Sequence, residues 1–311
     1  MIELSDWIKN IFFARHETFA PRYGWLKKGY DAVNQNGADV FDSDNAIEHL
    51  GVGKNMVRAI RFWCMAYNIL EPVTEKKPLR VGGQMKITEF GGQLLSDENG
   101  WDPFLEDIAS HWLLHWKLFM PPIFATAWPL AMNISLLGNF SAKDLASAIA
   151  ERLSQQDTFK RYSLASLEKD ASCFIRMYGS SQSKNAEEIE CPFTQLGLLL
   201  PGNNRQTFSF NTGEKVTLPD LIYLASCFDF AAQTQPGLKT ISLHKLVYGF
   251  NSPGVLFRIS ESESGRRLEE GVKNISGIDF VESFGNRQLQ FEDDPALLAN
   301  KLLQRYYAAN C

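Results

Sequence analysis

Two short segments in the N-terminal third of the sequence carry side chains that could bind a metal ion or move a proton. The first is RHETF, at positions 15–19, in which His16 stands beside Glu17. An imidazole next to a carboxylate can transfer a proton, and the carboxylate can bind a hard cation. We therefore predict His16 as a general acid or base, and Glu17 as a catalytic residue and metal ligand.

The segment that follows RHETF interleaves cations with aromatic rings and glycines. Cations neutralise phosphates, rings stack on bases, and glycines allow a backbone to approach a nucleic acid strand. We predict that four cations here hold DNA, namely Arg15, Arg22, Lys27 and Lys28. In the alternative interpretation, which the spacing supports equally, the aromatic residues belong to the core and the cations reach out from it to solvent.

The second segment, GWDPFLED at positions 100–107, concentrates carboxylates. Asp102, Glu106 and Asp107 carry the oxygen ligands that Mg²⁺ (or Mn²⁺) prefers, so we predict these three, together with Glu17, as metal ligands. The alternative is helix capping. Pro103 suits the first position of a helix that starts at Asp102, and acids stabilise the amino end of a helix.

Several catalytic motifs are absent from the sequence. His111 and His115 have a spacing that can bind a transition metal, but Trp112 stands where a zincin requires glutamate. We therefore expect a histidine pair packed among aromatic rings. The sequence contains no P-loop, no GxSxG motif and no HNH signature, and Glu214-Lys215 alone does not make a PD-(D/E)xK nuclease motif.

Residues 43–95 show the order helix, turn, helix, hairpin, which is typical of a winged helix. A short helix that contains Ala46, Ile47 and Leu50, capped by Ser43 or Asp44, precedes a glycine turn. A second helix is expected from Lys54 to Tyr67, followed by a hairpin over 79–87 and a short helix over 88–95. The second helix carries three cations at spacings of four and three, which suits contact with DNA phosphates: Lys54, Arg58 and Arg61. The alternatives are a protein-interaction module or a solvated helix face.

These patterns predict a mainly α-helical, multi-domain protein with small β wings. We expect an N-terminal winged-helix domain over 1–118, a helical middle domain over 119–215, in which Ser141 and Asp144 cap a helix, and a C-terminal winged-helix-like domain over 216–311. The last domain would contain helices near 242–247 and 253–271 and a hairpin over 278–291. Its helical segment mixes acids with Arg266 and Arg267, which favours a protein interface.

Composition narrows the class of protein. The 311 residues have a formal net charge of −5, which excludes a uniformly basic surface but not a local basic patch.

Five cysteines lie far apart, which fits a reducing cytoplasm, and we expect no signal peptide. The uncharged stretch 118–142 is long enough to cross a bilayer, but its three prolines and its polar residues favour a buried element between domains.

Four segments together resemble one bacterial family, the SspB-type proteins of DNA phosphorothioation defence systems. They are RHETFAPRYGWLKKGYDA (15–32), GVGKNMVRAIRFW (51–63), ITEFGGQLL (87–95) and GWDPFLEDIASHWLLHWKL (100–118). The resemblance continues more weakly through CPFTQLGLLLP (191–201). It implies a DNA nickase that uses a divalent metal, so that sulfur can replace a non-bridging phosphate oxygen. It also implies two partners, an ATPase and a PAPS-reductase-like protein, with a cysteine desulfurase supplying the sulfur.

We therefore expect a cytoplasmic, metal-dependent nickase that binds double-stranded DNA and acts in anti-phage defence. The site residues are inferred from their chemistry and are not carried over from the family. Two alternatives stay open: a non-catalytic DNA-binding adaptor that recruits the modification enzymes, and a winged-helix transcription regulator.

Overall fold

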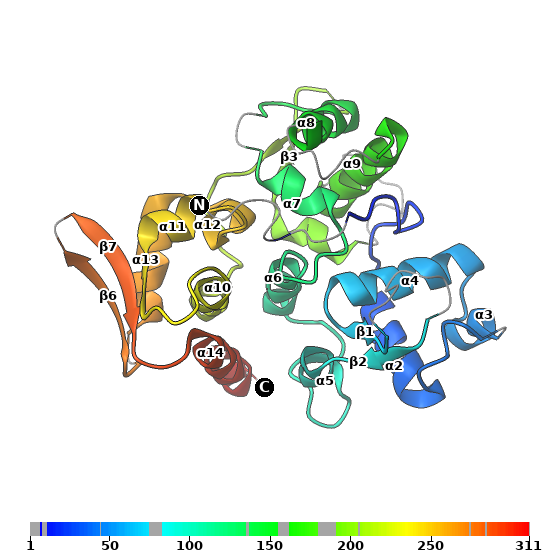
Figure 1. The fold of residues 1–311 in the computed structure, drawn as a ribbon, viewed down its shortest axis with the longest axis horizontal. Coiled ribbons are helices and arrows are strands. Elements are labelled where there is room, and N and C mark those ends of the chain that lie inside the picture. Colours follow the sequence, from blue (N-terminus) through cyan, green and yellow to red (C-terminus); the bar gives the residue numbers. More distant parts are fainter. Residues whose placement is uncertain are drawn as a thin grey trace.

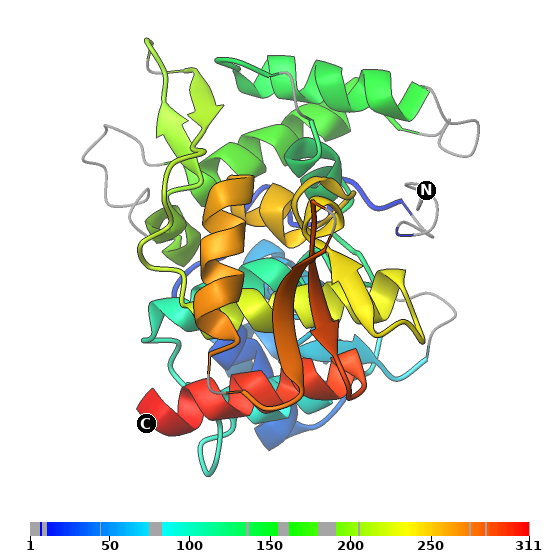
Figure 2. The same cartoon turned by 90° about the vertical axis from the view of Figure 1, so that its left-hand side faces the viewer.

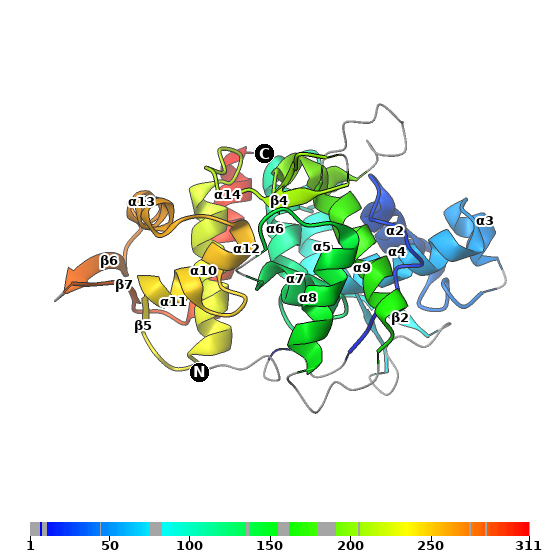
Figure 3. The same ribbon diagram turned by 90° about the horizontal axis from the view of Figure 1, so that it is seen from above.

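The computed structural model describes Trp7 and residues 11–43, 45–74, 83–134, 137–154, 162–179, 191–204, 206–273, 275–283 and 285–310. Helices dominate, and the strands form three small antiparallel sheets, which confirms the predicted mainly α-helical class with small β elements. The elements lie in three groups, with helix α6 at the centre (Figure 1). Viewed from above, the N-terminal and C-terminal groups occupy opposite ends of the molecule (Figure 3).

The N-terminal group holds the predicted helix pair. Its elements are α2 (Trp25–Asn36), α3 (Ala46–Leu50), α4 (Lys54–Ala66), β1 (Leu70–Pro72), β2 (Met85–Ile87) and α5 (Glu89–Leu95). Gly51, at φ 61°, makes the left-handed turn between α3 and α4, a conformation that favours glycine. Val57, Ile60, Cys64 and Tyr67 are buried, which confirms the predicted apolar face.

The second strand of the predicted hairpin over 79–87 is confirmed as β2 (Met85–Ile87). Strand β2 pairs with β1, so that Leu70 lies opposite Ile87, and the predicted strand at 79–81 lies outside the described residues. The pairing therefore joins strands on either side of a longer connection. The short helix after the hairpin is confirmed: Thr88 caps α5 by accepting a hydrogen bond from the Gly91 amide.

The middle group is built mostly of helices. Its elements are α6 (Ile108–Lys117), α7 (Ala127–Met132), α8 (Ala142–Ser154), α9 (Leu164–Tyr178), the 3₁₀ helix η3 (Pro192–Leu196), β3 (Leu199–Pro201) and β4 (Phe208–Phe210). Ser141 and Asp144 exchange hydrogen bonds at the start of α8, as the sequence predicts. Within the described ranges, no helix has the length and apolar character needed to cross a bilayer.

The C-terminal group contains a three-stranded sheet in the order β5-β7-β6. Its elements are α10 (Asp220–Thr234), β5 (Thr240–Ser242), α11 (Leu243–Tyr248), α12 (Pro253–Phe257), α13 (Glu261–Gly271), β6 (Ile278–Ser283), β7 (Asn286–Phe291) and α14 (Pro295–Asn310). The predicted hairpin over 278–291 is confirmed and lies on the outer face above α14 (Figure 2). The predicted helix over 253–271 is instead two helices, because the chain turns at Arg258, where φ is 54°.

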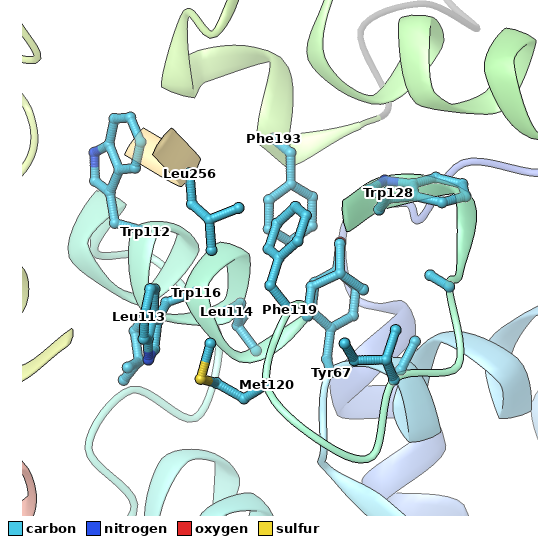
Figure 4. Packing of buried hydrophobic residues seen from close by; sticks show 14 of the residues in the cluster. Tyr67, Trp112, Leu113, Leu114, Trp116, Phe119, Met120, Trp128, Phe193 and Leu256 are labelled. Atoms are coloured by element: carbon cyan, nitrogen blue, oxygen red, sulfur yellow. The ribbon is translucent and has the colours of Figure 1, made fainter. Parts of the chain in front are cut away.

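One hydrophobic core runs through all three groups and is rich in aromatic residues (Figure 4). Six of the seven tryptophans are buried, so their concentration before position 129 reflects core packing. The ring of Tyr67 stacks on Phe193 with centroids 5.0 Å apart, which joins the N-terminal and middle groups. Trp101, which precedes α6, stacks on Tyr307 of α14 with centroids 5.0 Å apart, and this contact joins the C-terminal group to the rest of the core. The groups are therefore packed against one another through large side chains.

Candidate nucleic-acid interface

The RHETF segment forms a tightly held loop between α4 and α9. Ala14, Glu17 and Thr18 all have positive φ, at 53°, 50° and 66°, a conformation that residues other than glycine adopt only when the surroundings impose it. Here α9 imposes it. The Ala14 amide donates to Asp170 Oδ1 at 2.9 Å, and Arg176 donates to the Thr18 carbonyl. The loop is thus fixed at both ends.

His16 points into the protein from this loop. Its Nε2 lies 2.6 Å from Asp170 Oδ1, its ring packs against Trp63 and Trp128, and it is 1% exposed. Burial lowers the pKa of His16, but Cys173 and the bond to Asp170 outweigh burial and raise the pKa to about 10. This argues against the predicted role in proton transfer, because the imidazole is buried and already paired with Asp170. His16 is a positioning residue that anchors the loop.

Glu17 lies on the accessible side of the same loop. Its Oε1 is 3.6 Å from the Arg58 guanidinium of α4, and both side chains are about one-third exposed. The ion pair joins the loop to the cation-bearing face of α4, and the indole of Trp63 on the same helix donates to the Phe19 carbonyl at 3.0 Å. Glu17 thus faces a cation.

The acids of GWDPFLED act mainly as caps, which corrects their predicted role in a shared metal site. Asp102 accepts hydrogen bonds from the amides of Glu106 and Asp107 and from the Ser110 hydroxyl. Asp107 caps α6 through the Ala109 amide and accepts a bond from Tyr306. Helix α6 therefore starts at Ile108, and the predicted start at Asp102 is wrong.

The predicted ligand set of Glu17, Asp102, Glu106 and Asp107 does not fit a preformed Mg²⁺ site. The side-chain oxygens of Asp102 and Asp107 are occupied by the bonds within and around the turn, Glu17 is paired with Arg58, and Glu106 is exposed. Across the described part of the chain, no group of three or more His, Cys, Asp or Glu side chains could hold a metal ion.

The histidine pair on α6 is packed among aromatic rings, as predicted. His115 Nδ1 lies 2.8 Å from the Tyr178 hydroxyl and its Nε2 lies 3.0 Å from the Leu256 carbonyl oxygen. His111 packs edge-on against Tyr23 and Phe193. Burial lowers the pKa of both histidines, that of His115 to about 4.

Two of the seven cations predicted to bind DNA are buried, which corrects their assignment. Lys27 is 8% exposed and its Nζ pairs with Asp31 and Asp97; burial opposes its charge, but these two bonds raise its pKa. Arg61 is also 8% exposed, and burial lowers its pKa against the attraction of Asp42. Neither side chain can bind a phosphate without breaking internal contacts.

The other five cations are at least partly accessible and lie on segments that touch one another. Lys54 is exposed and Arg58 is partly exposed on α4. Lys28 of α2 is exposed and donates to the Leu50 carbonyl at the turn before α4. The remaining two, Arg15 and Arg22, flank the loop, and Arg22 lies over the ring of Trp25. We name these five residues the basic face.

Sequence reasoning missed Asp170, the residue that organises the loop. The signal was an acid within an apolar helical stripe, since Leu167, Ala171 and Phe174 of α9 are buried on the same side. A carboxylate at such a position is seldom left without a buried partner. The sequence could therefore indicate that Asp170 has a partner, but not which residue it is.

The buried histidines predict how stability depends on pH. The pKa of His115 falls from 6.5 to about 4 on folding, so the unfolded chain takes up a proton between these values and stability falls as the pH falls. The pKa of His16 rises to about 10, so the unfolded chain releases a proton first and stability falls as the pH rises above 6.5. We expect the unfolding temperature to be highest near neutral pH. A steady rise from about pH 5 to about pH 9 would contradict this expectation.

Comparisons with known proteins agree on one relationship. The model of a family described as "Protein of unknown function (DUF4007)" matches residues 13–307. Two crystal structures, one of magnesium ion-bound SspB and one of SspB, are each 34% identical to this chain and superpose with TM-scores of 0.88 and 0.87. In both, the match covers 96% of this chain and 88% of the other. No curated protein matches.

Proposed function

This chain belongs to the DUF4007 family and is an SspB-type protein, and from that premise we propose that it is a DNA-binding, divalent-metal-dependent nickase. It would act in DNA phosphorothioation and anti-phage defence, with the Ssp-system ATPase and a PAPS-reductase-like protein as partners. The observation that carries the proposal is the 34% identity to SspB over nearly the whole chain, because such a likeness extends far beyond a shared fold class.

We propose that the N-terminal group is a winged helix that docks on duplex DNA. The order α2, α3, α4, β1, β2 matches that motif, and α4 is the helix that would enter the major groove. The basic face supplies the phosphate contacts, with Lys54 and Arg58 on α4 itself. The RHETF loop then lies beside the duplex, because Glu17 and Phe19 contact α4.

The C-terminal group has a similar order of elements and a different charge pattern. Helices and strands follow one another in the order α10, β5, α11, α12, α13, β6, β7, and the strand order β5-β7-β6 resembles that of a winged helix. On α13, Arg266 and Arg267 pair with acids, including Glu263 and Asp220, so their charges are neutralised locally. We propose that this second winged helix contacts a protein partner.

Metal dependence rests on the magnesium-bound relative and on the chemistry of cleavage. A bound Mg²⁺ would polarise the scissile phosphate and lower the pKa of an attacking water. Mg²⁺ in nucleic acid enzymes is usually held by one or two carboxylates together with substrate phosphates. Glu17 and Glu106 are the predicted ligands whose carboxylates stay accessible, whereas Asp102 and Asp107 are occupied as caps.

The proposal is tested by incubating the purified chain with supercoiled plasmid. We expect open circles in the presence of Mg²⁺ and none when EDTA is added. Glu17→Gln should slow nicking, because it removes the accessible carboxylate beside the basic face, whereas Glu151→Gln, at an exposed position of α8, should not. Unchanged nicking by Glu17→Gln and by Glu106→Gln would show that neither holds the metal.

One observation favours the adaptor as a second candidate. The residues that the structure describes include no cluster of metal ligands. An adaptor would shift plasmid DNA in a salt-sensitive manner without cutting it, with or without Mg²⁺. A chain that neither binds nor nicks DNA would contradict both candidates.

A further inference from the structure

We propose that a cavity between the N-terminal and C-terminal groups binds a nucleoside or another planar, uncharged heteroaromatic molecule. The cavity has a volume of about 420 Å³, within the range of small-molecule sites. Its walls come from α5 and α6 on one side and from α10 and α14 on the other. The inference is independent of DNA nicking.

The aromatic walls of the cavity are held rigidly. Trp101 stacks on Tyr307 with an angle of 10° between the ring planes, and the indole of Trp116 donates to Asp229 Oδ2 at 2.9 Å. Phe90 is 9% exposed and lies 5.5 Å from the Lys117 ammonium. Trp116 is 1% exposed, so a flat molecule would pack chiefly against Trp101, which is partly exposed and whose fixed ring loses little conformational freedom on binding.

A buried ion pair supplies directional polar groups to the same cavity. Lys117 Nζ donates to Asp229 Oδ2 at 2.8 Å, and both side chains are less than one-fifth exposed. Burial raises the pKa of Asp229, but Lys117 and Trp116 outweigh it and lower the pKa, so Asp229 is ionised. The hydrogen bonds that the structure gives Asp229 all end on Oδ2, which leaves Oδ1 as an acceptor within the described residues.

Three amide side chains complete the polar lining, from Asn68, Gln93 and Asn300. Each offers both a donor and an acceptor in one plane, which is the pattern that the edges of nucleobases present. Apolar walls with a few such groups provide stacking and edge recognition together. The lining therefore fits a nucleobase better than an aliphatic ligand.

The charge of the lining argues against a phosphorylated ligand. Glu71, Glu89 and Asp229 contribute three carboxylates, and Lys117, which Asp229 already binds, is the one cation among the lining residues. Lys86, beyond the cavity, pairs with Glu71. A phosphate would meet an excess of negative charge. We therefore assign the cavity to the nucleoside and not to its monophosphate.

The test is thermal unfolding and calorimetric titration of the full chain with the four common nucleosides and their 5′-monophosphates. We expect at least one nucleoside to raise the unfolding temperature by roughly 2–4 °C at a hundredfold excess over its Kd. Its monophosphate should bind at least about tenfold more weakly. Failure of every nucleoside to bind would overturn the proposal, as would a monophosphate that binds equally well.

Matched variants locate the site. Asn300→Leu removes an amide from one wall of the cavity and should abolish the rise in unfolding temperature that the nucleoside causes. Gln93→Leu removes an amide from the opposite wall and should have the same effect. Gln233→Leu, at an exposed position of α10 outside the cavity, should leave that rise in unfolding temperature unchanged. Binding that survives both cavity variants would overturn the assignment. Because these experiments contain no DNA and no metal, their failure is distinct from failure of the proposed nickase.

Discussion

Replacing Asp170 with alanine is expected to lower the free energy of unfolding by about 3–5 kcal/mol, the usual cost of removing one member of a buried ion pair. The change leaves His16, which is 1% exposed, without its partner, and also removes the acceptor for the Ala14 amide. Urea denaturation followed by tryptophan fluorescence measures the loss, because His16 packs against Trp63 and Trp128.

Two controls identify the cause of this loss. Asp293→Ala breaks the exposed Lys301–Asp293 pair at the start of α14 and should leave the free energy of unfolding nearly unchanged. The alkaline decline in stability should also become smaller in Asp170→Ala, because Cys173 and Asp170 together hold the pKa of His16 above its ordinary value and only Asp170 is removed. A variant that keeps both its stability and the alkaline decline would show that the pair does not anchor the loop.

The double variant Lys54→Glu, Arg58→Glu is expected to weaken duplex DNA binding at least about tenfold at low salt. Both residues lie on the accessible side of α4, and reversing them turns two predicted phosphate contacts into repulsions. The slope of log K against log salt concentration should become shallower by about two. Fluorescence anisotropy with a labelled duplex measures both quantities over a salt series.

The matched control reverses two exposed lysines elsewhere, in Lys143→Glu, Lys169→Glu on α8 and α9. This control changes the net charge by the same amount, so a general electrostatic effect would weaken binding equally in both proteins. An equal loss in both proteins would show that net charge, and not contact at the basic face, accounts for the weaker binding. Thermal unfolding of the α4 variant checks that the new repulsion at Glu17, next to Arg58, has not disrupted the fold.

Local sequence patterns predicted the elements that depend on neighbouring residues. The period of 3.6 placed Val57, Ile60 and Cys64 on the buried face of α4, and all three are buried. The reciprocal hydrogen bonds that cap the start of α8 join Ser141 and Asp144, which are three residues apart. Each of these features is decided within one or two helical turns.

The predictions that failed concern residues whose surroundings are set by segments distant in the sequence. Arg61 follows Lys54 by seven residues and falls near the same helix face, but the loop that carries Asp42 lies near it, and Arg61 is buried. The sequence places His16 beside Glu17 and so predicts a reactive pair, whereas the buried partner of His16, Asp170, lies 154 positions away. Residue spacing predicts contacts within a helix or a hairpin, but not a contact between residues so far apart in the sequence.

The position of α14 has a consequence for how the protein is made. Tyr306 bonds to Asp107, Tyr307 bonds to Ser110, and Trp101 stacks on Tyr307, so the start of α6 is completed by the helix that the ribosome synthesises last among those described. Nascent chains otherwise tend to fold from the amino end, one domain at a time. Here the start of α6 and the ring of Trp101 reach their final packing only after α14 has been synthesised, so this part of the first half cannot be completed while it emerges.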